Sequence, residues 1–402
     1  MHILIVTQYF WPEEFRINDL ARGLAQRGIR VTVLTGLPNY PEGKIFPGYK
    51  NTGPLREIWE GIDIIRSPMI ARGNNSKIKL ALNYVSFAVS ASVVGAFRTP
   101  ADVDAIFVYE PSPITVGIPG AVCRWRSKAP SFIWILDLWP ESLEASGLVR
   151  SPIIKAIAGW VARQVYRFSD VVLVPSKGYE EPIRKVAKRV LDVRYFPQWS
   201  DDATGASTDA TFDIGEGFNV VFTGNVGEAQ DFEAIIDAAD RCRLHPGIRW
   251  IIVGDGRRLQ WAKQRVVELG LSNVVFTGRV PSGAIPEILQ QADVLLATLR
   301  DDPTFSLTVP AKIQTYMAAG KPLVTAINGE VARLVSEAGA GVAVSSGASD
   351  QIAAAVIRLF QMSDDERGRL GKNALSCYDL NFSRIQSIDK LIGWIIKERK
   401  IR

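Results

Sequence analysis

Two series of apolar runs, separated by helix-like segments, limit the fold of this chain more than any other feature. The first series comprises HILIVTQYF, RVTVLTG, DAIFVYE, PSFIWILDLW and DVVLVPS, and the second comprises FNVVFTG, RWIIVG, NVVFTG, ADVLLATL and KPLVTAI. Continuous apolar runs of this length are typical of parallel strands that are buried on both faces of a sheet and connected by helices. The alternation therefore predicts an α/β fold with two doubly wound, Rossmann-like domains.

The break between the two series marks a domain boundary. Residues 197–217 are rich in Gly, Ser, Thr and Asp and poor in aliphatic side chains, which is typical of a linker. A chain of 402 residues is also longer than one core usually supports. We expect ligands at the carboxyl ends of the strands and in the cleft between the domains. The predicted parts are an N-terminal domain over 1–198, a linker over 199–218, a C-terminal domain over 219–378 and a C-terminal helix over 379–402 that returns to the N-terminal domain.

Composition removes several classes of function. The chain has two histidines, His2 and His245, and both a histidine metal site and a Ser-His-Asp triad need imidazole at the reacting centre. The three cysteines are far apart, which fits a reducing cytoplasm. Neither GxGxxG nor GxxxxGK[ST] occurs, so NAD-binding and simple ATPase functions lose support. The DxD-like pattern at Asp102 and Asp104 precedes a strand instead of following one, so we expect no metal in the site.

Charge and hydropathy suggest an anionic partner and a membrane surface. Residues 1–200 hold 25 basic and 17 acidic residues, a net charge of +8, whereas the remainder has a net charge of −3. Such a basic half suits nucleic acid, anionic lipid or a phosphorylated substrate, and the absence of an aromatic-basic pattern makes nucleic acid the least favoured. Residues 80–97 carry no charge but include Asn83 and three serines, which favours a buried or interfacial helix over a membrane span. No signal-peptide pattern opens the chain, so we expect a cytoplasmic protein that contacts the membrane through its basic N-terminal domain.

The last residues, KLIGWIIKERKIR, are basic and amphipathic. Such a segment fits membrane contact and a solvated closing helix equally well.

Three features of the C-terminal domain predict a phosphate site. Gly224 and Gly227 flank a turn at one strand end, and Gly254 follows the next strand; glycine turns allow backbone to approach a ligand. Pro310 and Ala311 open a helix that carries Lys312 in its first turn. A helix N-terminus with an added lysine suits a diphosphate leaving group. The alternative is that the glycine turns only connect elements and that Lys312 is a solvated lysine.

The N-terminal domain offers a second set of strand-end side chains. Asp137 ends a strongly apolar strand, and Pro140 with Glu141 fits a helix start. Glu14 and Arg16 follow the first strand on the same rim, next to Glu13. Two alternatives stay open: Asp137 is a turn residue that caps the helix, and Arg16 either holds a phosphate or pairs with a glutamate.

Several motifs together resemble the glycosyltransferase family 4 enzymes of the GT-B architecture, in particular the WbuB-like branch of bacterial O-antigen, capsule and colanic acid transferases. The motifs run in family order over nearly the whole chain. They are QYFWPEEFRINDLARGLAQRG, the PNYP of Pro38 to Pro41, DLWPES from Asp137, TGNVGEAQ from Thr223, GRVP from Gly278, and VPAKIQTYMAAGKP.

The resemblance implies retaining transfer from a UDP-sugar without a cofactor or a required metal. It places the donor in the C-terminal domain and the acceptor, a saccharide on an undecaprenyl diphosphate carrier, in the N-terminal domain. The implied donor-binding residues are Gly224, Asn225, Gly227, Gln230, Gly254, Arg279, Val280, Pro281, Pro310, Ala311, Lys312, Thr315 and Tyr316. The implied acceptor-binding residues are Glu14, Arg16, Tyr40 and Glu141, and Asp137 and Lys312 are the catalytic candidates.

The chain also departs from the family pattern. The family carries two glutamates around this helix, where Leu307 and Thr315 stand here, and the usual Arg and Lys of the glycine turn are replaced by Asn225 and Gln230. The positive charge therefore moves to Lys312, and the ribose contact passes to Thr315, Tyr316 or another group. Asp137 stands near the place of the usual strand-end histidine, where it either receives the acceptor proton or orients the acceptor.

The expected function is transfer of an N-acetylated hexose, with 6-deoxy character suggested by Leu307, to a lipid-linked saccharide. One alternative is a UDP-N-acetylglucosamine 2-epimerase of the same shape, which would need more titratable groups than two distant histidines. The other is a protein that binds nucleotide sugars without catalysis.

Overall fold

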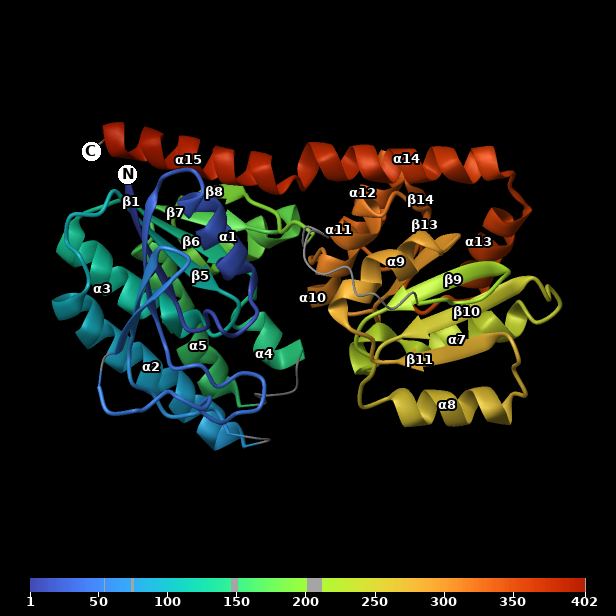
Figure 1. Cartoon of the computed structure of the whole chain (residues 1–402), viewed down its shortest axis with the longest axis horizontal. Helices are drawn as coiled ribbons and strands as arrows, with labels where there is room; N and C mark the ends of the chain where they lie inside the picture. The colour runs from blue at the N-terminus through green and yellow to red at the C-terminus, as the bar shows by residue number, and fades with distance from the viewer. Residues whose placement is uncertain (54, 74–75, 146–150, 201–211, 402) are drawn as a thin grey trace. The chain divides into compact units, whose positions relative to one another are not determined.

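The computed structural model describes residues 1–53, 55–73, 76–145, 151–200 and 212–401, and it divides into two compact units (Figure 1). Unit 1 comprises Met1–Phe196 and Ile385–Arg402, and unit 2 comprises Pro197–Arg384. Of the predicted linker, residues 201–211 lie outside the described part, and Phe218 already begins the first strand of unit 2.

Unit 1 is built on an eight-stranded sheet in the order β3-β4-β2-β1-β5-β6-β7-β8. Every neighbouring pair is parallel except β3 and β4, which form an antiparallel hairpin. The central strands β1, β5 and β6 are buried along their whole length, as the continuous apolar runs predict. The strands are β1 (His2–Thr7), β2 (Arg30–Thr35), β3 (Leu55–Trp59), β4 (Ile62–Arg66), β5 (Ala105–Glu110), β6 (Ser131–Ile135), β7 (Val171–Val174) and β8 (Asp192–Tyr195).

Helices cover both faces of this sheet. Right-handed crossovers place α2, α3, α5 and α6 on one face, where each packs against the next, and α1 on the other. The last helix, α15, belongs to unit 1, where Asp389 and Glu398 form ion pairs with Arg27 and Arg194 at 2.7 and 2.5 Å. The helices are α1 (Arg16–Ala25), α2 (Lys77–Arg98), α3 (Gly117–Ser127), α4 (Glu141–Ala145), α5 (Pro152–Arg167), α6 (Glu180–Ala187) and α15 (Arg384–Ile401), with 3-10 turns η1 (Ile114–Val116) and η2 (Lys177–Tyr179).

Unit 2 repeats the plan with a six-stranded, fully parallel sheet in the order β11-β10-β9-β12-β13-β14. Its strands are β9 (Phe218–Thr223), β10 (Ile248–Val253), β11 (Val274–Gly278), β12 (Val294–Thr298), β13 (Leu323–Ala326) and β14 (Gly341–Val344). Its helices are α7 (Phe232–Arg241), α8 (Leu259–Glu268), α9 (Ile285–Gln290), α10 (Pro303–Ser306), α11 (Ala311–Ala318), α12 (Glu330–Ala338), α13 (Ser349–Gln361) and α14 (Asp364–Asn381), with η3 (Glu228–Gln230) and η4 (Ser282–Ala284).

The structure adds edge elements that the apolar alternation did not reveal. Strands β3, β8 and β14 lie at sheet edges and have exposed or half-buried residues throughout. β3 and β8 also contain charged residues, so they lack the apolar runs of the central strands. The segment 379–402 also contains two elements, because α14 ends at Asn381 and α15 begins at Arg384.

Candidate functional site

Two glycine turns pack against each other at the carboxyl ends of β9 and β10. Gly224 and Gly254 both have positive φ, at 132° and 145°. A Cβ atom on Gly254 would lie 1.8 Å from the carbonyl oxygen of Gly224, so only glycine fits there. The sequence predicts Gly254 as a donor-binding residue. In the structure, Gly254 permits the close backbone contact that shapes the Gly224 turn.

Lys312 points its ammonium group at this turn from the first turn of α11. Its Nζ atom is buried and has no hydrogen-bond partner among the residues that the structure describes. Nζ lies 3.9 Å from the centroid of the Phe222 ring, and a Cβ atom on Gly224 would lie 3.2 Å from it. Burial lowers the pKa of Lys312 to about 7. The alternative of a solvated lysine is excluded, since the ammonium is buried and no described residue forms an ion pair with it.

Asn225, Gly227 and Gln230 surround the second half of the turn. A Cβ atom on Gly227 would lie 2.3 Å from Asn225 Nδ2 and 3.2 Å from Gln230 Oε1. Within the described part of the chain, Gln230 Oε1 is buried without a hydrogen-bond partner. A buried amide oxygen of this kind is costly unless a ligand or water supplies a donor, so the turn has an unsatisfied acceptor close to an unsatisfied cation.

The structure corrects the prediction for Tyr316. Its side chain is fully buried in the core of unit 2, and its hydroxyl accepts a hydrogen bond from the Thr223 backbone N–H at 2.8 Å. Tyr316 therefore fixes the end of β9 instead of contacting ribose, because its position on α11 faces the sheet. Thr315 is half-buried and donates to the Ala311 carbonyl at 3.3 Å.

The remaining predicted donor residues lie at the ends of elements. Pro310 precedes the first residue of α11, and Ala311 begins that helix with an exposed side chain. Arg279 and Pro281 are exposed after β11, whereas Val280 packs against the core. Gly224, Gly254 and Arg279 thus directly follow the carboxyl ends of three neighbouring strands, β9, β10 and β11.

In unit 1, Asp137 follows β6 at the carboxyl edge of the larger sheet. Burial raises the pKa of its carboxyl, and the polar groups of Ser142, Ser112 and Trp139 oppose that shift. The Asp137 backbone N–H donates to Glu110 Oε2 at 3.4 Å. The carboxyl group of Asp137 is thus half-buried and lies near the carboxyl group of Glu110.

Glu110 is a functional candidate that the sequence interpretation missed. It is the last residue of β5, it is fully buried, and its Oε1 has no hydrogen-bond partner among the described residues. Burial, followed by the charge of Asp137, raises the pKa of Glu110 well above its usual value. The signal was available, because Glu110 ends an apolar strand just as Asp137 does, and β5 pairs with β6.

The backbone and aromatic rings around the two carboxyl groups are also unusual. Ser112 has a φ of 110°, a region that non-glycine residues rarely adopt, and its hydroxyl accepts from Trp139 Nε1 at 3.3 Å. Tyr84 of α2 lies edge-on to Trp139 with a centroid distance of 6.5 Å. The buried hydroxyl of Tyr166 has no partner within the described ranges, and burial followed by Glu110, Glu141 and Asp137 raises its pKa.

The rim residues after β1 form a connected aromatic group. Tyr40 is 39% exposed and contacts Tyr9 and Phe15, and the Arg72 guanidinium lies 5.0 Å above its ring. The charge of Arg72 also influences the pKa of Tyr84, so the group extends toward Trp139 and Asp137.

Three acidic or basic residues on this rim have different surroundings. Glu13 is buried and accepts hydrogen bonds from the Asn39 and Tyr40 N–H groups at 2.8 Å; burial raises its pKa to about 7. Glu14 is exposed, and Arg16 begins α1. Burial raises the pKa of Tyr109, and the charge of Arg16 opposes that shift. Glu13 thus holds the loops together through its buried carboxylate.

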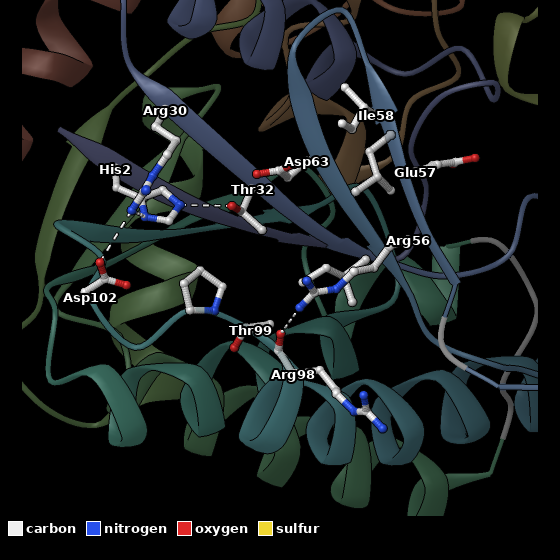
Figure 2. Close-up of a pocket in the computed structure, with 13 residues that line it drawn as sticks. His2, Arg30, Thr32, Arg56, Glu57, Ile58, Asp63, Arg98, Thr99 and Asp102 are labelled. Carbon is white, nitrogen blue, oxygen red and sulfur yellow. Dashed lines mark hydrogen bonds and ion pairs between the residues drawn. The ribbon is translucent and has the colours of Figure 1, made fainter.

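A hollow of about 590 Å³ lies at the opposite edge of the unit 1 sheet (Figure 2). Its walls include the first residues of β1, β2 and β4 and the end of α2. Two of its basic side chains interact within the wall (Figure 2): Arg30 lies 3.5 Å from Asp102, and Arg56 donates to the Arg98 carbonyl at 2.9 Å. Ligands of parallel α/β sheets bind at the carboxyl ends of strands, so we do not assign the reaction to this hollow.

The comparisons with known proteins identify the family of the chain. Residues 14–198 match the family model described as "Glycosyl transferase 4-like domain", and residues 217–362 match "Glycosyl transferases group 1". The two matches cover unit 1 and unit 2 in turn. The chain therefore belongs to the group 1, family 4-like glycosyltransferases, and its two Rossmann-like units form the GT-B architecture.

Curated relatives and solved structures give the same class. WcaI of Escherichia coli (strain K12), whose name assigns it to colanic acid biosynthesis as a glycosyl transferase, is 26% identical over 80% of this chain and 82% of its own. WbjE of Pseudomonas aeruginosa, named as a glycosyltransferase, is 26% identical over 68% of this chain and 71% of its own.

Among solved structures, Anabaena HepE in complex with UDP has a TM-score of 0.68 at 16% identity, covering 99% of this chain and 100% of HepE. Sucrose-phosphate synthase from Thermosynechococcus elongatus has a TM-score of 0.70 at 16% identity, covering 99% of this chain and 98% of that one. Both confirm the predicted fold.

Proposed function

We propose that this glycosyltransferase moves an N-acetylated hexose from a UDP-sugar to a saccharide on undecaprenyl diphosphate, with retention of configuration at the anomeric carbon. The transfer takes place at the cytoplasmic face of the membrane during surface polysaccharide synthesis. The donor occupies the glycine turns of unit 2, and the acceptor occupies the Asp137 site of unit 1. Leu307, in place of a polar residue of the family, supports a sugar with 6-deoxy character.

The observation that carries the proposal is the buried, unpartnered ammonium of Lys312 beside Gly224. A buried cation without an anion is unfavourable unless a ligand compensates it. A diphosphate supplies that anion, and the N-terminus of α11 adds its positive dipole end. Lys312 then stabilises the charge that develops on UDP as it leaves, so the proposal requires no metal ion there.

The chemistry needs a bond between the acceptor oxygen and the anomeric carbon, while the bond from that carbon to the diphosphate oxygen breaks. The electron pair of the broken bond stays on UDP. The acceptor hydroxyl loses its proton, and Asp137 is the carboxylate that we assign to bind it or to receive the proton. A neutral Glu110 next to Asp137 favours this role, since a neutral neighbour lets Asp137 carry the charge.

The solved structures support a UDP-linked donor. HepE was solved with UDP, and another structural neighbour of this chain was solved with UDP-2-fluoro glucose. The name of WcaI, which refers to colanic acid biosynthesis, supports a role in polysaccharide synthesis. The net charge of +8 over residues 1–200 supports an acceptor that carries a diphosphate and lies at a membrane surface.

A donor screen followed by a transfer assay tests the proposal. We expect UDP-sugars to raise the melting temperature, since ligand at about 100 times its dissociation constant stabilises by about 2.7 kcal/mol. The matching UDP-sugar should then be transferred to a short-chain polyprenyl-diphosphate GlcNAc. Lys312→Ala should lower turnover by about 10² or more, the effect of removing a group that stabilises developing charge. Lys263→Ala, at an exposed position on α8, is the matched control.

Three outcomes contradict the proposal. Turnover of Lys312→Ala close to that of Lys263→Ala would remove the assigned role of Lys312. Consumption of UDP-N-acetylglucosamine without any acceptor would indicate a 2-epimerase. Donor binding without transfer to any lipid-linked acceptor would indicate a non-catalytic nucleotide-sugar binder.

A further inference from the structure

Helix α2 of unit 1 exposes a continuous apolar stripe. Ile78, Val85, Val89 and Phe97 are 74, 57, 62 and 78% exposed, and Leu82 and Val93 complete a spacing of three or four residues. This spacing places all six side chains on one face of the helix. α2 is also long and apolar enough to cross a membrane by length and composition, and 33% of its most apolar window is buried. The stripe is therefore an apolar surface without a protein partner in the described parts of the chain.

The neighbouring helices extend this surface. α3 packs against α2, and α5 packs against α3 (Figure 1). α3 exposes Trp125 at 79%, and α5 exposes Ile153 and Trp160 at 70 and 60%. Exposed tryptophans beside aliphatic residues are typical of proteins that insert side chains at a membrane interface.

The charge of these three helices is entirely positive. Their sequences contain eight basic residues and no Asp or Glu. The basic residues are Lys77, Lys79, Arg98, Arg124, Arg126, Lys155, Arg163 and Arg167. Arg124 is neutralised by an ion pair with Asp170 at 2.7 Å. An apolar surface with basic residues and no acidic residue complements an anionic lipid bilayer.

The inward face of α2 packs on the rest of unit 1, which argues against a helix that crosses a membrane. Asn83 accepts a hydrogen bond from Gln8 of unit 1 at 2.7 Å, and Ser90 donates to the Pro68 carbonyl at 2.5 Å. A Cβ atom on Gly95 would lie 2.8 Å from Cys123 Sγ, so α2 contacts α3 closely. Insertion across a bilayer would break these contacts and separate β4 from β5, the two strands that α2 joins.

The surface also begins next to the proposed acceptor site. In a parallel α/β sheet the helices run opposite to the strands, so the N-terminal halves of α2 and α5 lie at the carboxyl edge. Tyr84, in the N-terminal half of α2, lies beside Trp139, which follows Asp137 by two residues. Lipid on this surface is therefore close to the carboxyl groups of Glu110 and Asp137.

We propose that the outward faces of α2, α3 and α5, named the lipid face, lie on the surface of an anionic phospholipid bilayer. The aliphatic stripe and the two tryptophans enter the interface, and the basic residues contact lipid phosphates. This inference rests on the proposed function for its acceptor, because it names the surface through which unit 1 approaches a lipid-linked substrate.

Vesicle binding of the full-length protein tests the lipid face. We expect stronger co-sedimentation with vesicles of phosphatidylglycerol and phosphatidylcholine than with phosphatidylcholine alone, and weaker binding in high salt. Val89→Glu combined with Val93→Glu should lower the partition coefficient at least tenfold. Val267→Glu, on the exposed face of α8 in unit 2 at 79% exposure, is the matched control and should bind like the wild type. Arg98→Gln and Arg167→Gln should each weaken binding to the anionic vesicles about fivefold.

Tryptophan quenching locates the contact independently of these variants. Brominated lipids should quench the fluorescence of the wild type, and the quenched fraction should fall in a Trp125→Phe and Trp160→Phe double variant. Equal vesicle binding by Val89→Glu/Val93→Glu and wild type would overturn the proposal. A wild-type dimer in solution that these glutamates convert to monomer would also overturn it, since a second copy would then occupy the face.

Transfer to a water-soluble acceptor separates this proposal from the proposed function. The glutamate variants should keep wild-type turnover on that acceptor and unchanged circular dichroism. Intact vesicle binding without any transfer would contradict the proposed function and leave the lipid face supported, whereas transfer without vesicle binding would contradict the lipid face alone.

Discussion

The two strand-end sites bury ionisable groups of opposite sign. Unit 2 buries the ammonium of Lys312 beside the Gly224 turn, and burial lowers its pKa to about 7. Unit 1 buries the carboxyl groups of Glu110 and Asp137, and burial raises the pKa of both. In each site burial favours the neutral form of the group. The same fold plan thus prepares one unit for an anion and the other for a group that gives up a proton.

The difference shows how one architecture divides a transfer reaction. A buried cation is stabilised when a diphosphate arrives, so the unit 2 site gains from donor binding. A half-buried carboxylate is a stronger base than an exposed one, so the unit 1 site suits an acceptor hydroxyl. The predictions below change one site at a time.

The largest effect is expected at Asp137. Asp137→Asn keeps the shape of the side chain but removes its basicity, and we expect turnover to fall by about 10² to 10⁴. UDP binding should be unchanged, because the proposed UDP site lies in unit 2. Steady-state transfer assays and UDP thermal shifts measure the two effects separately. Asp102→Asn, whose side chain is 83% exposed at the other edge of the sheet, serves as the control, and a similar loss in both variants would contradict a role for Asp137.

UDP affinity should depend on pH through Lys312. The protonated ammonium binds the diphosphate, and the empty site has a pKa of about 7. Above pH 7, the affinity for UDP should fall by up to about tenfold for each further pH unit, because the lysine must first be protonated before it binds the diphosphate. Calorimetric titration with UDP at pH 7 and 9 measures this effect. Lys312→Met should bind weakly at both values, and a parallel decline in Lys312→Met and wild type would show that another group is responsible.

The smallest expected effect is a pair of opposite pH dependences of stability. Burial places the pKa of Glu110 above the unfolded value of 4.5, so its native state binds more protons and its contribution to stability falls as pH rises above 4.5. Lys312 has a native pKa of about 7 against 10.5 unfolded, so its contribution rises between pH 7 and 10.5. Each slope is at most about 1.4 kcal/mol per pH unit.

Urea unfolding of Glu110→Gln and Lys312→Met across pH 5 to 9 measures these slopes. Relative to the wild type, Glu110→Gln should gain stability as pH rises, and the advantage of Lys312→Met at pH 7 should shrink toward pH 9. Glu42→Gln, at an exposed loop position, should stay parallel to the wild type. Slopes of the same sign in both variants would contradict the contrast between the two sites.

Strand-end reasoning predicted part of the candidate site. It selected Asp137 and the Gly224 turn, because residues after an apolar run lie at the ligand edge of a parallel sheet. Lys312 was selected by a different rule, the anion-binding N-terminus of a helix. The strand-end rule also applies to Glu110, the last residue of β5. The sequence interpretation did not use it there, because it counted Glu110 as part of the strand. The family resemblance offered Tyr316 as one of the candidates for the ribose contact, whereas the hydroxyl of Tyr316 accepts a hydrogen bond from the Thr223 N–H in the core.

The sequence by itself determined the two α/β domains, because the apolar period fixes strands and helices locally. It also determined the positive charge of α2, α3 and α5, which composition alone decides. Only the tertiary structure decided which ionisable side chains are buried, because the burial of Lys312 and Glu110 depends on contacts with segments far away in the chain. The same holds for α2, because its sequence has apolar residues on every side and does not reveal which face is buried in unit 1 while the stripe from Ile78 to Phe97 stays exposed.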